Sequence, residues 1–417
     1  MKKPILLKNI NFFDVENDVI KENVDIIIEN DLIKEIKKST KGNSLDFKII
    51  DCTDKYAVPG LFESHAHLCW LTTFENKEKE KILEQFVKKG ITQVRDVGGP
   101  FDILKKMKEE INSNTIIGPE IFYAGPMLER SPLTWEKFNE KLPEFTVPIN
   151  TEEDVDKIIQ KLQEYKASLI KTFNRFDLEI YKYLAKEAKK INLPITHDPG
   201  TPLFNSVPMD SAIDLGIKCI EHGKAPWPAV LKNKLQKEHD KLCNSKFKPE
   251  EYKAFAMKIF SMGIDSISIE KLHKLADKMV QNNVYICPTL TVFKNKSEEK
   301  DKKTTEIVKT LYMMSSFFIE ELIKQNVKII IGIDNCLPNI FQEIKILKNL
   351  GLSENEIIKG ATKYPADWLN VYDKYGSIKS NRKANILIVK DNPLQAIENL
   401  EKTHIVFKNG DIVYKEK

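Results

Sequence analysis

The chain has 417 residues, 41% hydrophobic and 30% charged, and its 65 basic and 61 acidic residues leave a formal net charge of +4. This length suits one large α/β barrel with a satellite domain, or a few average domains, and the balanced charge gives no indication of a nucleic-acid partner. No apolar run approaches a membrane span or a secretory signal, and six scattered cysteines show no C-x-x-C pair. We therefore expect a cytoplasmic protein with a small-molecule substrate and no membrane partner, and leave a homo-oligomer open.

The two ends of the chain have the same character. Residues 1–60 read as short strands and turns, with period-2 alternation and β-branched residues, in stretches such as VDIIIEND and FKIIDCTDKYAVPG. Residues 371–417 are similar, with NILIVK, HIVFKNG and DIVYKEK. Two strand-rich ends around a long central region predict one small β-sandwich domain assembled from both termini.

Residues 61–370 alternate apolar strand segments with amphipathic helical segments, which indicates βαβ units and a parallel sheet. The predicted strands are 60–68, 91–98, 120–126, 168–173, 193–198, 216–223, 284–290 and 327–334; predicted helices include 75–89, 152–165, 178–190, 269–281 and 305–324. Eight such units describe a (β/α)8 barrel of the triosephosphate-isomerase type. A Lys/Glu-rich helical insertion is expected at about 229–266, as a solvated face or a lid.

Polar side chains that can bind metals recur where the predicted strands end. The segment FESHAHL places His65 and His67 at positions i and i+2, which share one face of a strand. Lys171 to His197 is 26 residues and His197 to His222 is 25, one βα unit each. The full set is His65, His67, Lys171, His197, His222 and Asp334. Because the carboxyl ends of barrel strands meet at one face, we expect these groups to converge there.

This order of H-x-H, Lys, His, His and Asp resembles the amidohydrolase superfamily, and the flanking β domain resembles that family's sandwich. The stretches VPGLFESHAHL, GITQVRDVGG, IKCIEHG and VYICPTLT are similar to the imidazolonepropionase-related branch that includes metal-dependent Xaa-Pro dipeptidases. The resemblance extends over essentially the whole chain.

The resemblance implies a two-metal centre. His65, His67 and Asp334 would hold one divalent ion, and His197 and His222 the other. An ammonium cannot ligate a cation, so Lys171 would react with carbon dioxide and bridge the ions as a carbamate. A hydroxide between the ions would attack the substrate, with Asp334 as general base and then general acid. Zinc is the default ion for these ligands, and manganese, iron and cobalt stay open.

Residues for substrate binding come from the remaining polar and aromatic side chains near strand ends. Arg95, Arg130 and Arg175 follow the second, third and fourth predicted strands, and an arginine fork suits a substrate carboxylate; the alternative for Arg95 is a pairing with Asp96 or with a loop backbone. Tyr123 and Trp227 are candidates for an apolar wall, with ordinary packing as the alternative. Together these residues favour a dipeptide or an N-acyl amino acid as substrate.

Three other functions remain open at this stage. A cyclic-amide, ester or lactone hydrolase would use the same metals, and a non-catalytic binding protein could keep the barrel and its ligands. Deaminases of the superfamily commonly carry a glutamate three residues after the strand-five histidine, where this chain has Gly200. The resemblance therefore favours amide hydrolysis over deamination.

Overall fold

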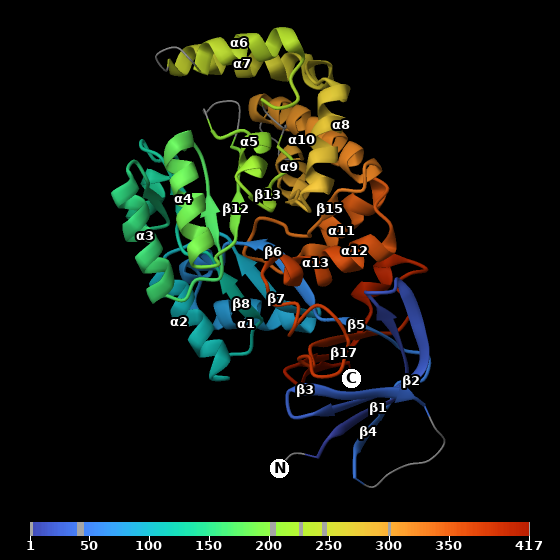
Figure 1. Cartoon of the computed structure of the whole chain (residues 1–417). Coiled ribbons are helices and arrows are strands. Elements are labelled where there is room, and N and C mark those ends of the chain that lie inside the picture. Colours follow the sequence, from blue (N-terminus) through green and yellow to red (C-terminus); the bar gives the residue numbers. More distant parts are fainter. Residues whose placement is uncertain are drawn as a thin grey trace.

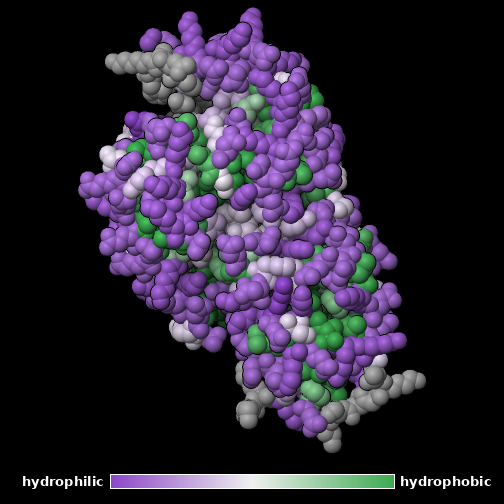
Figure 2. All heavy atoms as spheres, viewed as in Figure 1, coloured by the Kyte–Doolittle hydropathy of each residue, from purple (hydrophilic) through white to green (hydrophobic). Residues whose placement is uncertain are grey.

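The computed structural model describes residues 3–39, 46–200, 206–224, 228–243, 248–298 and 302–416. It is an α/β protein in which a terminal β-sheet lies at one end of a helix-covered parallel sheet (Figure 1). None of the helices in these ranges is long and apolar enough to cross a bilayer. The face drawn in Figure 2 is mainly hydrophilic, with hydrophobic residues showing in small separate groups.

Both ends of the chain contribute to one eight-stranded sheet, in the order β18-β17-β16-β5-β1-β2-β3, with β4 paired to β1. Its strands are β1 (Ile5–Asp14), β2 (Val19–Glu29), β3 (Leu32–Lys38), β4 (Lys48–Asp51), β5 (Tyr56–Pro59), β16 (Ile386–Val389), β17 (Thr403–Lys408) and β18 (Asp411–Lys415). Every residue of β16 is buried, as an apolar run of four predicts for a central strand. The sheet is consistent with a terminal β-sandwich; the domain boundaries at 60 and 371 stay a prediction.

Ten short strands form two further sheets, and every pairing in them is parallel. The three-stranded sheet contains β6 (Leu61–Ala66), β7 (Ile91–Asp96) and β8 (Glu120–Tyr123). The seven-stranded sheet runs in the order β10 (Thr146–Pro148), β9 (Met127–Glu129), β11 (Ile170–Thr172), β12 (Ile195–His197), β13 (Cys219–Glu221), β14 (Tyr285–Cys287) and β15 (Lys328–Ile329). All eight predicted strand segments contain one of these strands, whereas β9 and β10 were not predicted.

Backbone hydrogen bonds link the two parallel sheets. Ser64 N donates to Ile331 O (2.9 Å) and Asp334 N donates to His65 O (2.8 Å), so the segment after β15 lies beside β6. Elsewhere Ser168 N donates to Tyr123 O (2.9 Å), which puts the end of β8 beside the segment leading into β11. The carboxyl end of β6 therefore lies beside the segment that follows β15.

Amphipathic helices follow most of these strands and bury their apolar stripes against them. They are α1 (Asn76–Lys88), α2 (Phe101–Asn112), α3 (Glu152–Glu164), α4 (Leu178–Lys190), α5 (Met209–Asp214), α8 (Ile269–Gln281), α9 (Leu290–Ser297), α10 (Lys302–Lys324), α11 (Ile340–Asn349), α12 (Glu354–Gly360) and α13 (Lys363–Trp368). The start of α3 is fixed by a capping box between Thr151 and Asp154. The helices predicted at 75–89, 152–165, 178–190, 269–281 and 305–324 are confirmed.

The segment 229–266 contains α6 (Asn233–Cys243), α7 (Pro249–Met262) and a short 3-10 helix η3 (Gly263–Ser266). In Figure 1, α6 and α7 lie together at the end of the molecule remote from the terminal sheet.

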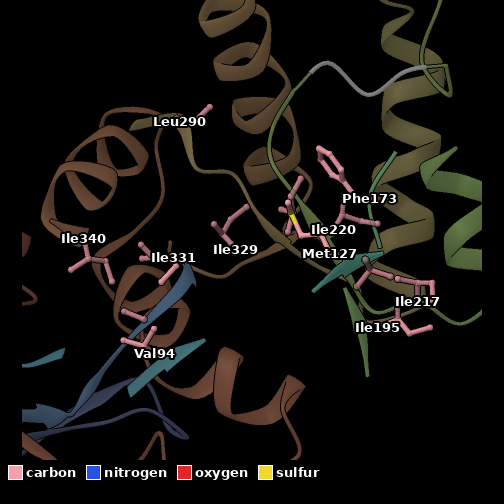
Figure 3. Packing of buried hydrophobic residues seen from close by; sticks show 14 of the residues in the cluster. Val94, Met127, Phe173, Ile195, Ile217, Ile220, Leu290, Ile329, Ile331 and Ile340 are labelled. Atoms are coloured by element: carbon pink, nitrogen blue, oxygen red, sulfur yellow. The ribbon is translucent and has the colours of Figure 1, made fainter. Parts of the chain in front are cut away.

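The main core lies between the parallel strands and the surrounding helices. Figure 3 shows part of it, with Ile195, Ile217 and Ile220 near Met127 and Phe173. A second core of apolar side chains is formed by the terminal sheet, among them Leu7, Ile26, Ile386 and Phe407.

Candidate metal centre

A cavity of about 490 Å³ opens at the carboxyl ends of the parallel strands, and five of the six predicted metal ligands line it. These are His65, His67, Lys171, His222 and Asp334. His65 Nε2 is 3.5 Å and His67 Nε2 is 3.2 Å from Asp334 Oδ1. Possible ligand atoms of these three residues all lie within 4.8 Å of one another, as a cation site requires.

Three histidines share the same arrangement, with Nδ1 bound to the protein and Nε2 directed toward the other polar groups. His65 Nδ1 lies 2.6 Å from Glu221 Oε2, His67 Nδ1 lies 2.9 Å from Gly98 O, and His222 Nδ1 lies 2.7 Å from Thr289 Oγ1. A carboxylate or a carbonyl oxygen can only accept, so His65 and His67 each carry a proton on Nδ1, and Nε2 is the nitrogen that faces Asp334. This is how proteins commonly orient metal-binding imidazoles.

Buried charges set the protonation of this cluster. Burial opposes ionisation of Asp334, but the neighbouring His65 and His67 outweigh it and hold the pKa of this carboxyl well below its usual range. Burial lowers the pKa of His65 to about 3. Burial also tends to lower the pKa of His67, but the contact with Asp334 outweighs burial and raises this pKa above its usual value. The cluster therefore presents a carboxylate and a neutral imidazole to a cation.

The local backbone explains how the chain brings these side chains together. A Cβ at Gly332 would lie 2.5 Å from His65 N and 2.7 Å from His65 Cβ, so only glycine allows this approach. Glu63 Oε1 accepts from His65 N (2.8 Å) and Ile333 N (3.0 Å), which ties β6 to the same segment. Burial raises the pKa of Glu63 to about 8.

Lys171 is almost fully buried on β11 and lines the cavity. Its Nζ makes no hydrogen bond within the described residues, and its nearest recorded charged partner is Asp198 Oδ2 at 3.9 Å. His65 Nε2 is likewise buried without a hydrogen-bond partner in the described part of the chain. Buried polar atoms are rarely left in this state, so both atoms fit a site that holds an additional polar group.

His197 is the one predicted ligand that does not line the cavity. Its Nδ1 lies 3.0 Å from Thr172 Oγ1 and its Nε2 lies 2.9 Å from Val207 O, so both ring nitrogens are bound to protein oxygens. In the parallel pair β11–β12, Thr172 is the partner of His197, while Lys171 is the partner of Thr196. Successive strand residues face opposite sides, so His197 lies on the side away from Lys171.

Asp198 lines the cavity beside His222 instead. Its Oδ2 is 3.0 Å from His222 Nε2 and 3.3 Å from Lys224 Nζ. Although burial opposes ionisation, Lys224 and His222 hold the pKa of Asp198 well below its usual value. Asp198 is not among the ligands predicted from the sequence; the available signal was its position directly after a predicted strand-end histidine.

The predicted substrate residues lie elsewhere. Arg95 is fully buried on β7, where Nε donates to Ser64 O and Nη2 lies 2.5 Å from Glu221 Oε1. Its guanidinium also lies 4.8 Å from the ring centroid of Trp368. Arg95 therefore pairs within the protein, but its carboxylate partner is Glu221 and not Asp96. In this position Arg95 supports the carboxylate that orients His65.

Three more predicted substrate residues, Arg130, Arg175 and Tyr123, are also outside the cavity lining. Arg130 is a surface residue whose Nη1 lies 3.7 Å from Asp177 Oδ2, and Arg175 donates through Nη1 to Pro132 O. Tyr123 is buried and donates to Tyr165 O, as ordinary packing would have it. Trp227 lies outside the described residues. The positive charges that do line the cavity are lysines, Lys171, Lys224 and Lys296.

Comparison with known proteins gives a consistent picture. Residues 268–413 match the amidohydrolase family. Two curated relatives are 5-methylthioadenosine/S-adenosylhomocysteine deaminases. The protein of Dictyoglomus turgidum is 34% identical over 87 residues, which are 21% of this chain and 20% of the relative. The protein of Caldanaerobacter subterraneus subsp. tengcongensis is 38% identical over 64 residues, which are 15% of this chain and 14% of the relative. The matches thus span at most a fifth of the length of these relatives.

Similar solved structures cover the chain far more completely. A Xaa-Pro dipeptidase with methionine bound in its active site has a TM-score of 0.76 at 21% identity, over 99% of this chain and all of the other. A putative prolidase from Bifidobacterium longum has a TM-score of 0.72 at 17% identity and covers 100% of this chain and 96% of its own. The A. niger ochratoxinase has a TM-score of 0.74 at 15% identity and covers 99% of this chain and 96% of its own. At such identities these likenesses establish the fold.

Proposed function

We propose that the chain is a member of the amidohydrolase superfamily and a metal-dependent hydrolase of a small amide, a dipeptide or an N-acyl amino acid. One observation carries this proposal: three histidines, each oriented through Nδ1, meet Asp334 and Lys171 in one cavity, and the Lys171 Nζ makes no hydrogen bond with a described residue. We also propose that the two parallel sheets close into a (β/α)8 barrel, supported by the hydrogen bonds between β6 and the segment after β15.

The donor set suits a pair of divalent ions, with zinc as the first choice. His65, His67 and Asp334 would hold one ion. Lys171, carboxylated by carbon dioxide, would serve both, and His222 would contribute to the second. His197 would have to give up its bonds to Thr172 and Val207 to join His222, whereas Asp198 already adjoins it. When bound, the ions would polarise the amide carbonyl and acidify a water molecule.

The chain's own residues would carry the proton and hold the substrate. Asp334 is the carboxylate placed to take a proton from the attacking water and return it to the leaving nitrogen. Lys224 and Lys296 line the same cavity and would attract a substrate carboxylate, the task first assigned to arginine. Hydrolysis adds hydroxyl to the acyl carbon and hydrogen to the nitrogen, giving a carboxylic acid and an amine.

The test is metal quantification of the purified protein, followed by assays on dipeptides and N-acyl amino acids. We expect about two ions per chain, amine release, and a loss of turnover of about 10²-fold or more in Asp334→Asn with metal retained. If the protein hydrolyses esters or lactones but no amides, its function is that of the rival ester or lactone hydrolase. A metal-loaded protein inert on all of these would identify a binding protein.

Deamination is the second candidate, favoured by the short matches to two deaminases. It predicts ammonia release from adenine nucleosides or related purines, which amide hydrolysis does not. Gly200 occupies the position where the superfamily's deaminases commonly carry their proton-transfer glutamate, so we expect no ammonia from these substrates.

A further inference from the structure

One side of the cavity is an aromatic wall formed by Trp70, Trp135, Phe138 and Phe145. The rings are in mutual contact: the centroid of Phe138 lies 5.6 Å from that of Trp135, 6.4 Å from Trp70 and 5.4 Å from Phe145. These are ordinary separations for interacting aromatic pairs. The wall is thus a continuous surface of rings.

The aromatic wall begins at the candidate metal centre and ends at the cavity mouth. Trp70 lies in the 3-10 helix η1 (Leu68–Thr73), directly after His67, and its ring stacks on that imidazole at 5.1 Å with an interplanar angle of 22°. Trp135 precedes a second 3-10 helix, η2 (Glu136–Glu140), and is 42% exposed. A large indole left this open at a cavity rim has apolar surface available for a ligand.

A second observation points to a ligand at this wall. Trp70 Nε1 is buried and makes no hydrogen bond with any described residue. An indole N–H in that position normally has an acceptor. A carbonyl or ether oxygen of a bound aromatic compound would supply one.

Beyond the histidines the cavity is lined by a pair of opposite charges, Asp198 and Lys224. Lys224 follows β13, and its Nζ lies 3.3 Å from Asp198 Oδ2. Between the wall and this lysine lies the histidine cluster: His65 is 5.5 Å from His67 and 4.6 Å from His222 between ring centroids. A substrate whose amide is at the histidines therefore has the aromatic wall on one side and a cation on the other.

We propose that the site accepts N-acyl amino acids whose acyl half carries an aromatic ring, bound on the aromatic wall, and whose carboxylate faces Lys224. The proposal rests on the proposed amide hydrolysis and names its substrate class. A flat aromatic surface favours a planar ring over a saturated ring of similar size, because stacking adds to the burial of apolar area.

The experiment compares four substrates of the metal-loaded full-length protein: N-(phenylacetyl)glycine, N-(cyclohexylacetyl)glycine, N-acetylglycine and N-acetylphenylalanine. We expect kcat/KM to be highest for N-(phenylacetyl)glycine and about 10-fold lower for the cyclohexyl compound. N-acetylphenylalanine carries the ring and the carboxylate on the same side of the amide, and it should be a poor substrate.

Variants test the wall itself. Trp135→Leu should reduce the preference for phenylacetyl over cyclohexylacetyl about 10-fold, and Trp135→Phe should restore most of it. Ile117→Ala is the matched control: Ile117 is 50% exposed, lies between α2 and β8, and is outside the cavity lining. Trp135 is itself 42% exposed, so its replacement should not unfold the protein.

A binding measurement separates this inference from the proposed function. Phenylacetate and cyclohexylacetate are titrated into the metal-loaded protein by calorimetry, which needs no turnover. Tighter binding of phenylacetate that disappears in Trp135→Leu supports the aromatic site even in a protein that hydrolyses no amide. Equal affinity for the two acids, or a preference unchanged in Trp135→Leu, would overturn the inference even in an active amidohydrolase.

Discussion

The buried pair of Arg95 and Glu221 offers the sharpest test of how the centre is supported. Both side chains are fully buried, with 2.5 Å between Arg95 Nη2 and Glu221 Oε1. Glu221 Oε2 also accepts a hydrogen bond from His65 Nδ1 (2.6 Å). Arg95→Met keeps the apolar volume but leaves the Glu221 carboxylate without its cation, and removing one partner of a buried pair costs about 3–5 kcal/mol.

The magnitude can be converted into a melting temperature. For 417 residues, an unfolding entropy of about 2.1 cal/mol/K per residue gives about 0.9 kcal/mol/K, so Arg95→Met should lower Tm by about 3–6 °C. Arg130→Met is the matched control, because its ion pair with Asp177 is at the surface and is worth about 1 kcal/mol or less. Its Tm should fall by about 1 °C or less.

The assay is thermal and urea unfolding of chelator-treated protein, which removes any contribution from bound metal. Arg95→Met combined with Glu221→Met should recover part of the lost stability, since no buried charge is then left alone. If Arg95→Met has the same Tm as the wild type and only raises KM for carboxylate substrates, Arg95 binds the substrate and does not stabilise Glu221.

Three further predictions concern single side chains. Lys171→Ala should lower the metal content of purified protein from two ions to one or none by elemental analysis, and two retained ions would rule out the lysine as a bridge. Asp198→Asn should lose metal while His197→Asn keeps it, because both nitrogens of His197 bind protein oxygens; the reverse result would restore His197 as the ligand. Burial raises the pKa of Glu343 from its usual 4.5 to about 7, so the unfolded state releases this proton first and stability falls as pH rises through that interval. Glu343→Gln should remove this part of the slope in urea titrations, and an unchanged slope would contradict the shift.

The strand-end residues of the site were predictable from the sequence because they depend on local rules. An H-x-H pair shares a strand face, and polar groups one βα unit apart meet at the same edge of a parallel sheet. The sequence did not show that Asp198 lines the cavity and His197 does not, since the two are neighbours and the strand register decides which of them faces the cavity.

Long-range pairing explains what else was missed. Arg95 and Glu221 are separated by 126 positions, so the sequence alone could not show that the arginine has an internal partner. The aromatic wall comes from two segments far apart in the sequence, and only the folded chain brings Phe138 against both Trp70 and Trp135. The eight strand segments, in contrast, followed from apolar runs and turn residues.

Gly60 is the single residue between β5 and β6, and therefore between the terminal sheet and the strand that bears His65. β5 pairs along its full length with β16, and Gly60 N donates to Asn385 O (2.8 Å). During translation, β5 lacks its partner β16 until residues 386–389 have been synthesised. A chain that stops before Asn385 would leave β5 without this partner next to the strand that bears His65, and we expect such a chain to bind metal more weakly than the full chain.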